Sequence, residues 1–129
     1  MKDLILEKMK VYRVELPEQT VTRKYNGRPV AVTTTETKGS HRCIAVVVDE
    51  DGQWAIVVPL TSAQDSQGGE KHKRPTWVRM IHDGRPVYAM AEQIRMVDRS
   101  RVFDQEGFIS NYDQEHLEKK LTQMFNFKS

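Results

Sequence analysis

The chain has 129 residues, a common size for a single domain, and can build one hydrophobic core but hardly two. Its 20 lysines and arginines nearly balance 18 aspartates and glutamates, so any anion-binding surface must be local. One cysteine excludes an internal disulfide, and no run resembles an export signal or the roughly 20 apolar residues of a membrane span. We therefore expect one soluble domain, residues 1–129, in the reducing cytoplasm.

The first third of the chain alternates with a period of two, which predicts strands rather than helices. Residues 1–9 can form one or two helical turns, and the alternation from Lys10 to Leu16 predicts the first strand. Segments 20–25 and 28–35 flank Asn26-Gly27, a pair that readily adopts the two positive φ angles of a tight turn. We expect a β-hairpin over residues 20–35 that stands out as a polar arm.

The middle of the chain predicts two buried strands and a loop. The apolar, β-branched run from Cys43 to Val48 indicates a central strand, and Trp54 to Leu60 indicates the next, with relaxed pairing at Pro59. The polar segment 62–75 has no periodicity and carries the basic cluster Lys71–Arg74. We expect a mobile basic loop there.

The last third predicts a second hairpin and a helix. Segments 77–81 and 86–91 flank Asp83-Gly84, and the last strand is expected to continue through 94–97. Ser110 or Asn111 can cap a helix over 113–125, whose apolar face, formed by Leu117, Leu121 and Met124, is expected to pack on the sheet. These elements indicate a mainly β protein, a small closed or half-closed antiparallel barrel with a C-terminal helix.

Four segments resemble the MazF/PemK family, the toxins of type II toxin–antitoxin pairs. The block from Glu92 to Arg101, EQIRMVDRSR, is similar to that family's Glu/Asp-Gln-Ile-Arg-Thr-Ile-Asp-Lys-x-Arg block. Upstream, VVPLTS at 57–62 is similar to a family strand ending in Pro-Leu/Ile-Thr-Ser, and GSHR at 39–42 resembles the Gly-x-x-Arg-Pro entry to the second family strand. Residues 11–16 lie where the family's first strand begins.

The resemblance implies an SH3-like barrel of the MazF/PemK/CcdB type, a homodimer, and an endoribonuclease that cleaves single-stranded RNA without a metal or other cofactor. It implies a cognate antitoxin partner, DNA contact only through that antitoxin, and no membrane association. In the family, residues at the positions of Arg42 and Thr61 carry the cleavage. The products would be a 2′,3′-cyclic phosphate and a 5′-hydroxyl.

The residue types suit this chemistry. Attack of a ribose 2′-hydroxyl places negative charge on the non-bridging phosphate oxygens, and Arg42 offers a planar, permanently charged fork to hold them. The Thr61 hydroxyl can donate one more bond. The sequence contains no His/Cys/Asp/Glu cluster at metal-ligand spacing.

The proton acceptor is less defined by sequence. His41 adjoins Arg42 and titrates near neutrality, but adjacent strand residues point to opposite faces. Glu92 occupies a position at which the family carries an acidic residue, and it is our second catalytic candidate. The candidates for RNA contact are mostly basic and come from the arm, the segment before Arg42, the loop and the family block. They are Arg23, Lys24, Arg28, Lys38, Ser40, His41, Lys71, Lys73, Arg74, Gln93 and Arg95.

Several of these residues have structural interpretations. Glu92 and Arg95 can form an ion pair or a dimer contact, and Asp98 and Arg101 can hold one end of the barrel. The scattered histidines at 41, 72, 82 and 116 are expected to be ordinary surface residues. Trp77 is expected in the core, and Trp54 either in the core or as a platform for base stacking.

The sequence departs from the family pattern at three places. Cys43 replaces the proline that usually follows the arginine, and Thr37-Lys38 replaces an acidic pair. The hairpin at 20–35 is an apparent insertion in the first inter-strand loop, which in the family closes over RNA and is displaced by antitoxin. It can enlarge the RNA groove or obstruct it.

Two rival functions remain open. The first is a barrel of this fold that has lost cleavage and binds RNA or protein. The second is a CcdB-like poison of DNA gyrase, although the ending Phe125-Asn126-Phe127-Lys128-Ser129 does not resemble the Trp-Gly-Ile ending of that activity.

Overall fold

Nine strands, two short 3-10 turns and one α-helix form the part of the chain that this computed structural model describes, namely residues 4–17, 20–33 and 38–126. The strands are β1 Lys10–Leu16, β2 Thr20–Tyr25, β3 Arg28–Thr33, β4 Gly39–Val48, β5 Trp54–Ser62, β6 Trp77–His82, β7 Arg85–Met90, β8 Arg95–Asp98 and β9 Val102–Phe108. The 3-10 turns are η1 Ala91–Gln93 and η2 Arg99–Arg101, and the helix is α1 Asn111–Met124.

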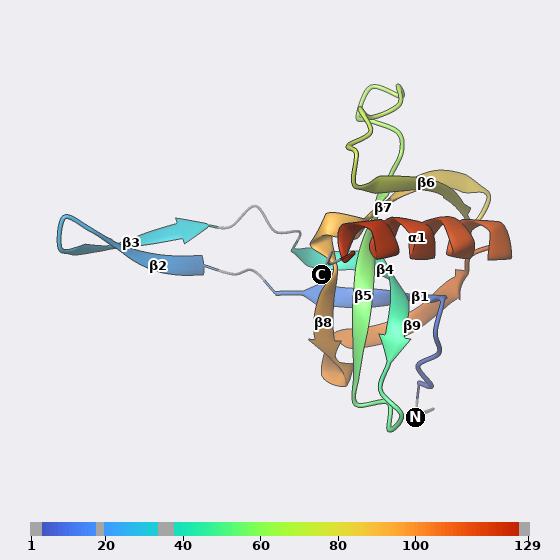
Figure 1. Cartoon of the computed structure of the whole chain (residues 1–129), viewed down its shortest axis with the longest axis horizontal. Helices are drawn as coiled ribbons and strands as arrows, with labels where there is room; N and C mark the ends of the chain where they lie inside the picture. The colour runs from blue at the N-terminus through green and yellow to red at the C-terminus, as the bar shows by residue number, and fades with distance from the viewer. Residues whose placement is uncertain (1–3, 18–19, 34–37, 127–129) are drawn as a thin grey trace.

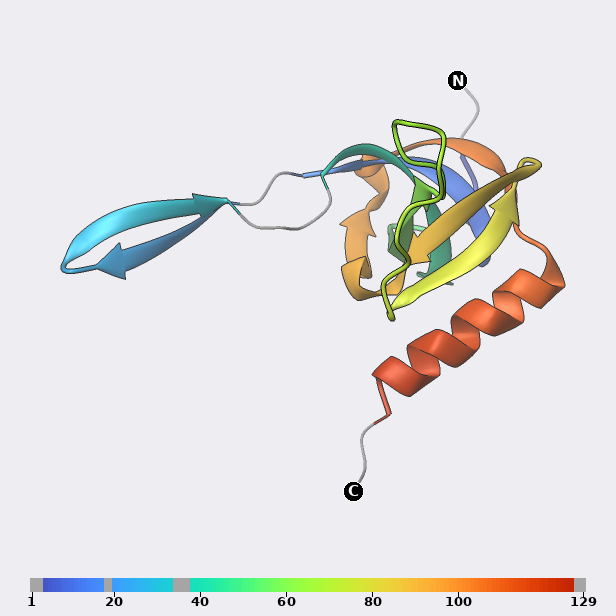
Figure 2. The same ribbon diagram turned by 90° about the horizontal axis from the view of Figure 1, so that it is seen from above.

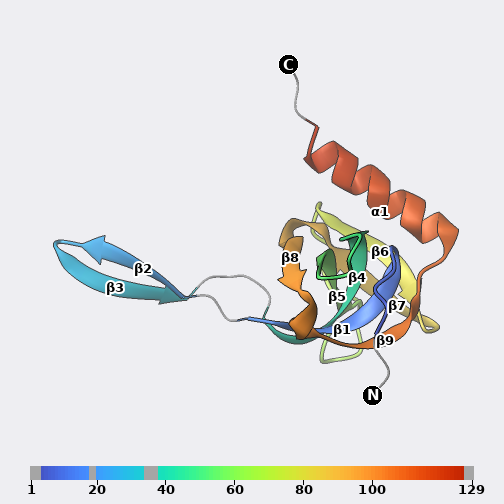
Figure 3. The same ribbon diagram turned by 90° about the horizontal axis from the view of Figure 1, so that it is seen from below.

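Seven of the strands form one antiparallel sheet in the order β6-β7-β5-β4-β1-β9, with β8 also paired to β5. The sheet curls around the core, as the views along and across it show (Figures 1 and 3). Among the described residues no backbone ladder joins the edge strands β6 and β9, so the barrel is the half-closed form of the expected architecture. The mainly β fold with one C-terminal helix is as predicted.

Strand β5 changes partner halfway along its length. Its residues 54–57 pair with β8 and residues 60–62 pair with β7, while β4 runs along the other side. On the β7 and β8 side Pro59 lies between the two short pairings, whereas on the other side it pairs with Cys43 of β4. The relaxed pairing predicted at Pro59 is therefore found on one side of β5 only.

The buried residues form two clusters. One lies under α1 and includes Leu117 of the helix with Val46, Met80 and Ile109, so the helix covers that side of the sheet (Figure 2). The other includes Tyr12, Val14, Cys43 and Val57. Successive residues of β4 alternate between the two clusters because strand side chains alternate between faces.

Both predicted tight turns are present. The φ angles are 51° at Asn26 and 75° at Gly27, and 53° at Asp83 and 75° at Gly84. The β2–β3 ribbon pairs only with itself and projects from the sheet (Figure 1). The predicted third strand extended to residue 35, but residues 34–35 lie outside the described part.

The helix begins two residues earlier than predicted. The Ser110 hydroxyl accepts a hydrogen bond from the Asp113 amide, which makes Ser110 the N-cap. The buried Asp113 carboxylate accepts a bond from the Ile81 amide at 3.1 Å. The start of α1 is thus tied to the end of β6.

Two expectations about secondary structure are wrong, and one strand was not predicted. Residues 4–9 contain no helix, and residues 1–3 lie outside the described part. The expected continuation of a strand through 94–97 is interrupted by η1, after which β8 pairs with β5 instead of extending β7. Strand β9 was not predicted, because its sequence VFDQEGF lacks an apolar alternation and contains Gly107.

Two segments differ from the prediction only in extent. Strand β4 begins at Gly39 rather than Cys43, so Arg42 lies within a strand. The segment predicted as a loop from residue 62 has no regular element, but β5 includes Ser62, and an isolated bridge joins Gln64 to Glu70. Its mobility stays a prediction.

The segment before β1 is held by Tyr12. The phenol oxygen accepts a hydrogen bond from the Glu7 amide at 2.7 Å and donates one to the Ile5 carbonyl at 3.1 Å. Because Tyr12 is 1% exposed, its removal from water raises the pKa of the phenol, which stays a neutral donor.

We therefore predict that Tyr12→Phe lowers the free energy of unfolding by about 1–3 kcal/mol, because two backbone groups lose their partner. The measurement is urea unfolding followed by circular dichroism. Tyr112→Phe is the matched control, since Tyr112 is 69% exposed and should be unaffected. Equal stability of Tyr12→Phe and wild type would contradict the assignment.

Candidate active-site groove

A polar groove opens where the start of β4, the β6–β7 turn and the end of β9 meet. It encloses ≈ 960 Å³. The residues that line it are Arg13, Arg42, Ser62, His82, Asp83, Arg85, Pro86, Val87, Gln105, Glu106 and Gly107. Three of these are arginines, which suits an anionic ligand.

Arg42 enters the groove from β4. Its Nη1 donates a hydrogen bond to Nδ1 of His82 at 2.9 Å. Among the described residues, no carboxylate lies within ion-pair distance of Arg42, so its charge is not neutralised by the fold. The arginine is therefore held in place while its positive charge stays available.

Arg13 is the cross-strand neighbour of Arg42, because β1 and β4 pair these two residues directly. Arg13 forms an ion pair with Glu106, with Nε 3.0 Å from Oε2 and Nη2 3.1 Å from Oε1. Like charges in directly opposite positions destabilise a sheet, and Glu106 removes much of that cost. One arginine of the pair is thus paired with an acid and the other is not.

The hydroxyl in this groove belongs to Ser62 and not to Thr61. Thr61 does not line the groove, and its Oγ1 accepts a hydrogen bond from Nζ of Lys71 at 2.8 Å. Since successive strand residues point to opposite faces, Ser62 lies on the Arg42 side of β5 and Thr61 on the other. The expected meeting of Arg42 with Thr61 is not found.

Glu92 lies in a different place. Its Oε1 accepts a hydrogen bond from the indole of Trp77 at 2.5 Å, and its Oε2 is buried with no hydrogen-bond partner among the described residues. Trp77 is half-buried and also contacts Arg74, whose guanidinium lies 5.5 Å from the ring centroid. Glu92 does not line the Arg42 groove.

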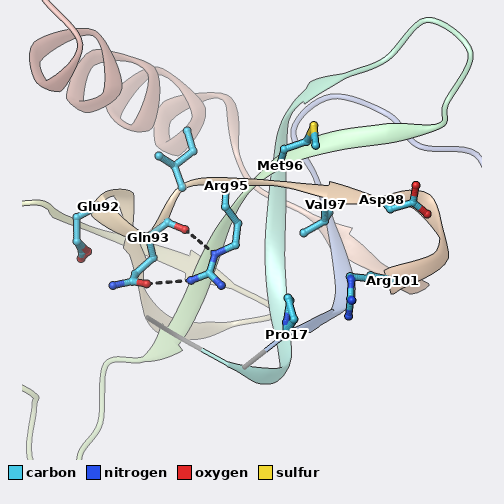
Figure 4. Close-up of a pocket in the computed structure, with 9 residues that line it drawn as sticks. Pro17, Glu92, Gln93, Arg95, Met96, Val97, Asp98 and Arg101 are labelled. Atoms are coloured by element: carbon cyan, nitrogen blue, oxygen red, sulfur yellow. Dashed lines mark hydrogen bonds between the residues drawn. The ribbon is translucent and has the colours of Figure 1, made fainter. Parts of the chain in front are cut away.

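The family-like block lines a second, smaller pocket of ≈ 310 Å³, which Figure 4 shows. Arg95 donates to the Gln93 backbone carbonyl and, at 3.0 Å, to the Gln93 side chain. Glu92 points away from Arg95 in this view, so the ion pair considered from sequence does not form (Figure 4). Asp98 caps η2 through the Ser100 amide, and hydrogen bonds from the Ser100 side chain and amide lower the pKa of Asp98, which fits its expected structural role.

The remaining candidates for RNA contact are spread over the surface. Arg28 is exposed at the tip of the arm, while Arg23 and Lys24 belong to β2 and their side chains lie outside the described part. His41 pairs with Val14 and does not line the groove, as the alternation along β4 requires. Lys38, Ser40, Lys73 and Arg74 are exposed, and Lys71 is half-buried against Thr61.

Sequence reasoning missed His82. It was expected on the surface, but it is 3% exposed and lies between two strands that are far apart in sequence. Its Nε2 is 2.6 Å from the Glu106 carbonyl oxygen, at a point where the β1–β9 register shifts by a bulge. Gly107 was the available signal, because a glycine inside a strand marks a bulge or a close approach of another group.

Cys43 follows Arg42 and faces the core. Its burial raises the pKa of the thiol to about 12, so this cysteine is not a nucleophile at neutral pH. Within the described part of the chain, no three His, Cys, Asp or Glu side chains form a group that could hold a metal ion. In the same part, none of the helices has the length and apolar character needed to cross a membrane.

Comparisons with known proteins agree with the fold. A family model described as "PemK-like, MazF-like toxin of type II toxin-antitoxin system" matches residues 10–125. A solved structure described as an endoribonuclease in complex with its cognate antitoxin from Mycobacterial species has a TM-score of 0.63 and 16% sequence identity, and the match covers 95% of this chain and 96% of that chain. No curated protein matches. At this identity the structural likeness concerns the fold.

Proposed function

Because this chain belongs to the PemK-like, MazF-like family of type II toxins, we propose that it is an endoribonuclease toxin that cleaves single-stranded RNA in the groove around Arg42. The observation that carries the proposal is the charge of Arg42, which is hydrogen-bonded to His82 and unpaired with any described carboxylate. A solved endoribonuclease of similar fold supports the activity class.

The reaction would use a hydroxyl of the substrate as its nucleophile. The ribose 2′-oxygen loses its proton and forms a bond to phosphorus, while the bond from phosphorus to the 5′-oxygen breaks and that oxygen takes up a proton, which gives a 2′,3′-cyclic phosphate and a 5′-hydroxyl. Arg42 would bind the non-bridging oxygens as their charge increases, and the Ser62 hydroxyl would donate to the same phosphate. We assign no step to Glu92 or Thr61, because neither lines this groove.

The partners follow from the family. We propose that a cognate antitoxin neutralises the chain and contacts DNA on its behalf, and that the toxin forms a homodimer in the cytoplasm. An antitoxin is bound in the complex of the similar solved structure, which supports the first of these.

A barrel that binds RNA or protein without cutting it remains the main rival. If cleavage requires Thr61, its separation from Arg42 favours a barrel that only binds RNA or protein. The presence of Ser62 beside Arg42 favours the enzyme, since a serine hydroxyl can make the same donation. Nothing in the groove specifically favours a gyrase poison.

We predict that the purified chain cuts single-stranded RNA in EDTA and that Arg42→Ala lowers the cleavage rate by about 100-fold or more, as expected for loss of a donor to a charged transition state. Rates are measured on labelled oligonucleotides, and the cyclic phosphate is identified by mass spectrometry. Arg79→Ala is the matched control, because Arg79 lies on β6 outside the groove and pairs with Glu70. Uncut RNA over a broad panel of sequences would favour the binding module.

We also predict that Ser62→Ala reduces the cleavage rate more than Thr61→Val does, by about 10-fold or more, because Ser62 lines the Arg42 groove and Thr61 does not. Thermal unfolding of both variants checks that each one folds. A larger loss of cleavage in Thr61→Val than in Ser62→Ala would instead identify Thr61 as the residue that supplies the catalytic hydroxyl.

A third prediction concerns the contribution of the arm to RNA binding. Residues 20–33 carry three cations, Arg23, Lys24 and Arg28, and no acidic residue. We predict that replacing all three with glutamine weakens binding of a non-cleavable RNA and lowers the salt slope by up to about 2 units, since each phosphate contact contributes about 0.7 on a single strand. Fluorescence anisotropy at several salt concentrations measures both. An unchanged slope would exclude the arm from the RNA path.

A further inference from the structure

We propose that His82, as a neutral imidazole, is the positioning residue that holds the Arg42 guanidinium in the groove without neutralising it. This inference rests on the proposed RNA cleavage for its effect on rate. Its structural basis is a chain of two hydrogen bonds that joins β9, β6 and β4.

The two bonds define the tautomer of His82. The Glu106 carbonyl oxygen can only accept, so the proton between it and Nε2, at 2.6 Å, belongs to the imidazole. Nδ1 then has a free lone pair, which accepts the bond from Nη1 of Arg42 at 2.9 Å. An imidazolium would carry a second proton at Nδ1 and could not accept from Arg42, so the ring must be neutral.

The surroundings of the ring restrict its orientation. The imidazole is 3% exposed. Gly107 has a φ of +100°, and a Cβ at that position would lie 3.4 Å from Nε2 of His82. The glycine bulge therefore lets the β9 backbone approach the ring and present the Glu106 carbonyl to it.

The contrast between the two arginines explains why a histidine suits this position. Arg13 is oriented by the Glu106 carboxylate, which also neutralises it. Arg42 is oriented by a neutral acceptor and keeps its full charge for a phosphate. Glu106 serves both sites, since its carboxylate binds Arg13 and its carbonyl accepts from His82.

The test compares two substitutions that each retain one half of the histidine. Asparagine places its amide near the position of Nδ1 and keeps an acceptor for Arg42, whereas glutamine reaches the position of Nε2 and keeps a donor for the Glu106 carbonyl. We expect His82→Gln to lower kcat by about 10- to 100-fold with little change in KM, because Arg42 loses its orientation. His82→Asn should stay within about threefold of wild type, the rescue expected for a positioning residue.

Other outcomes would overturn the inference. Equal activity of both variants and wild type would show that Arg42 needs no positioning by His82. Loss of activity in His82→Asn with retention in His82→Gln would show that the tie to Glu106 matters and the Arg42 bond does not. Thermal unfolding of both proteins separates these outcomes from a failure to fold.

A measurement on the wild-type chain keeps the inference separate from the proposed function. Nitrogen-15 NMR of the histidine side chains at neutral pH should show His82 with its proton on Nε2 and an unprotonated Nδ1. The same spectrum recorded for Arg42→Ala should show a shifted Nδ1 signal. A proton on Nδ1 or a charged ring would refute the inference even if RNA is cut, whereas the expected spectrum without RNA cleavage would refute only the proposed function.

Discussion

Strand β5 organises the structure, because it hydrogen bonds to three other strands. Its first half lies between β4 and β8, and its last three residues lie beside β7. A strand that pairs with two different strands along one edge must bend where the partner changes. Pro59 lies at that point of β5. The bend brings the β6–β7 hairpin, with His82 at its turn, over the start of β4. The groove is a consequence of that arrangement.

The chemistry of the groove depends on how two neighbouring arginines are accommodated. Arg13 and Arg42 face each other across β1 and β4, where like charges repel. The fold offsets this repulsion by giving one arginine a carboxylate, and it gives the other a neutral ring. A second carboxylate would have stabilised the sheet further but would have cancelled the charge that a phosphate requires. Arg42 therefore stays available to bind a phosphate, and the sheet forgoes a second ion pair at this position.

Local signals predicted the parts of the fold that local chemistry determines. Asn26-Gly27 and Asp83-Gly84 suit the positive φ angles of tight turns, and β1 alternates between buried and less buried residues from Tyr12 to Leu16. Strand β9 and the contacts of His82 depend on the meeting of distant segments, and the glycine at 107 was the one local signal for them. The resemblance pointed to the end of β5, where neighbouring residues face opposite sides of the sheet. Ser62 therefore lines the groove with Arg42 and Thr61 does not, and the catalytic role of either hydroxyl stays a prediction.

The inserted arm is connected to the groove through the strands themselves. The last pair of β1 and β4 is Leu16 with Gly39, and the Arg13–Arg42 pair lies three positions further along, about 10 Å away. Among the described residues β2 and β3 form a separate two-stranded sheet, and a two-stranded ribbon alone is only marginally stable, so a bound partner would stabilise it. On the proposed function, an RNA or antitoxin that contacts the arm would reach the arginine pair by following β1 and β4 over this distance.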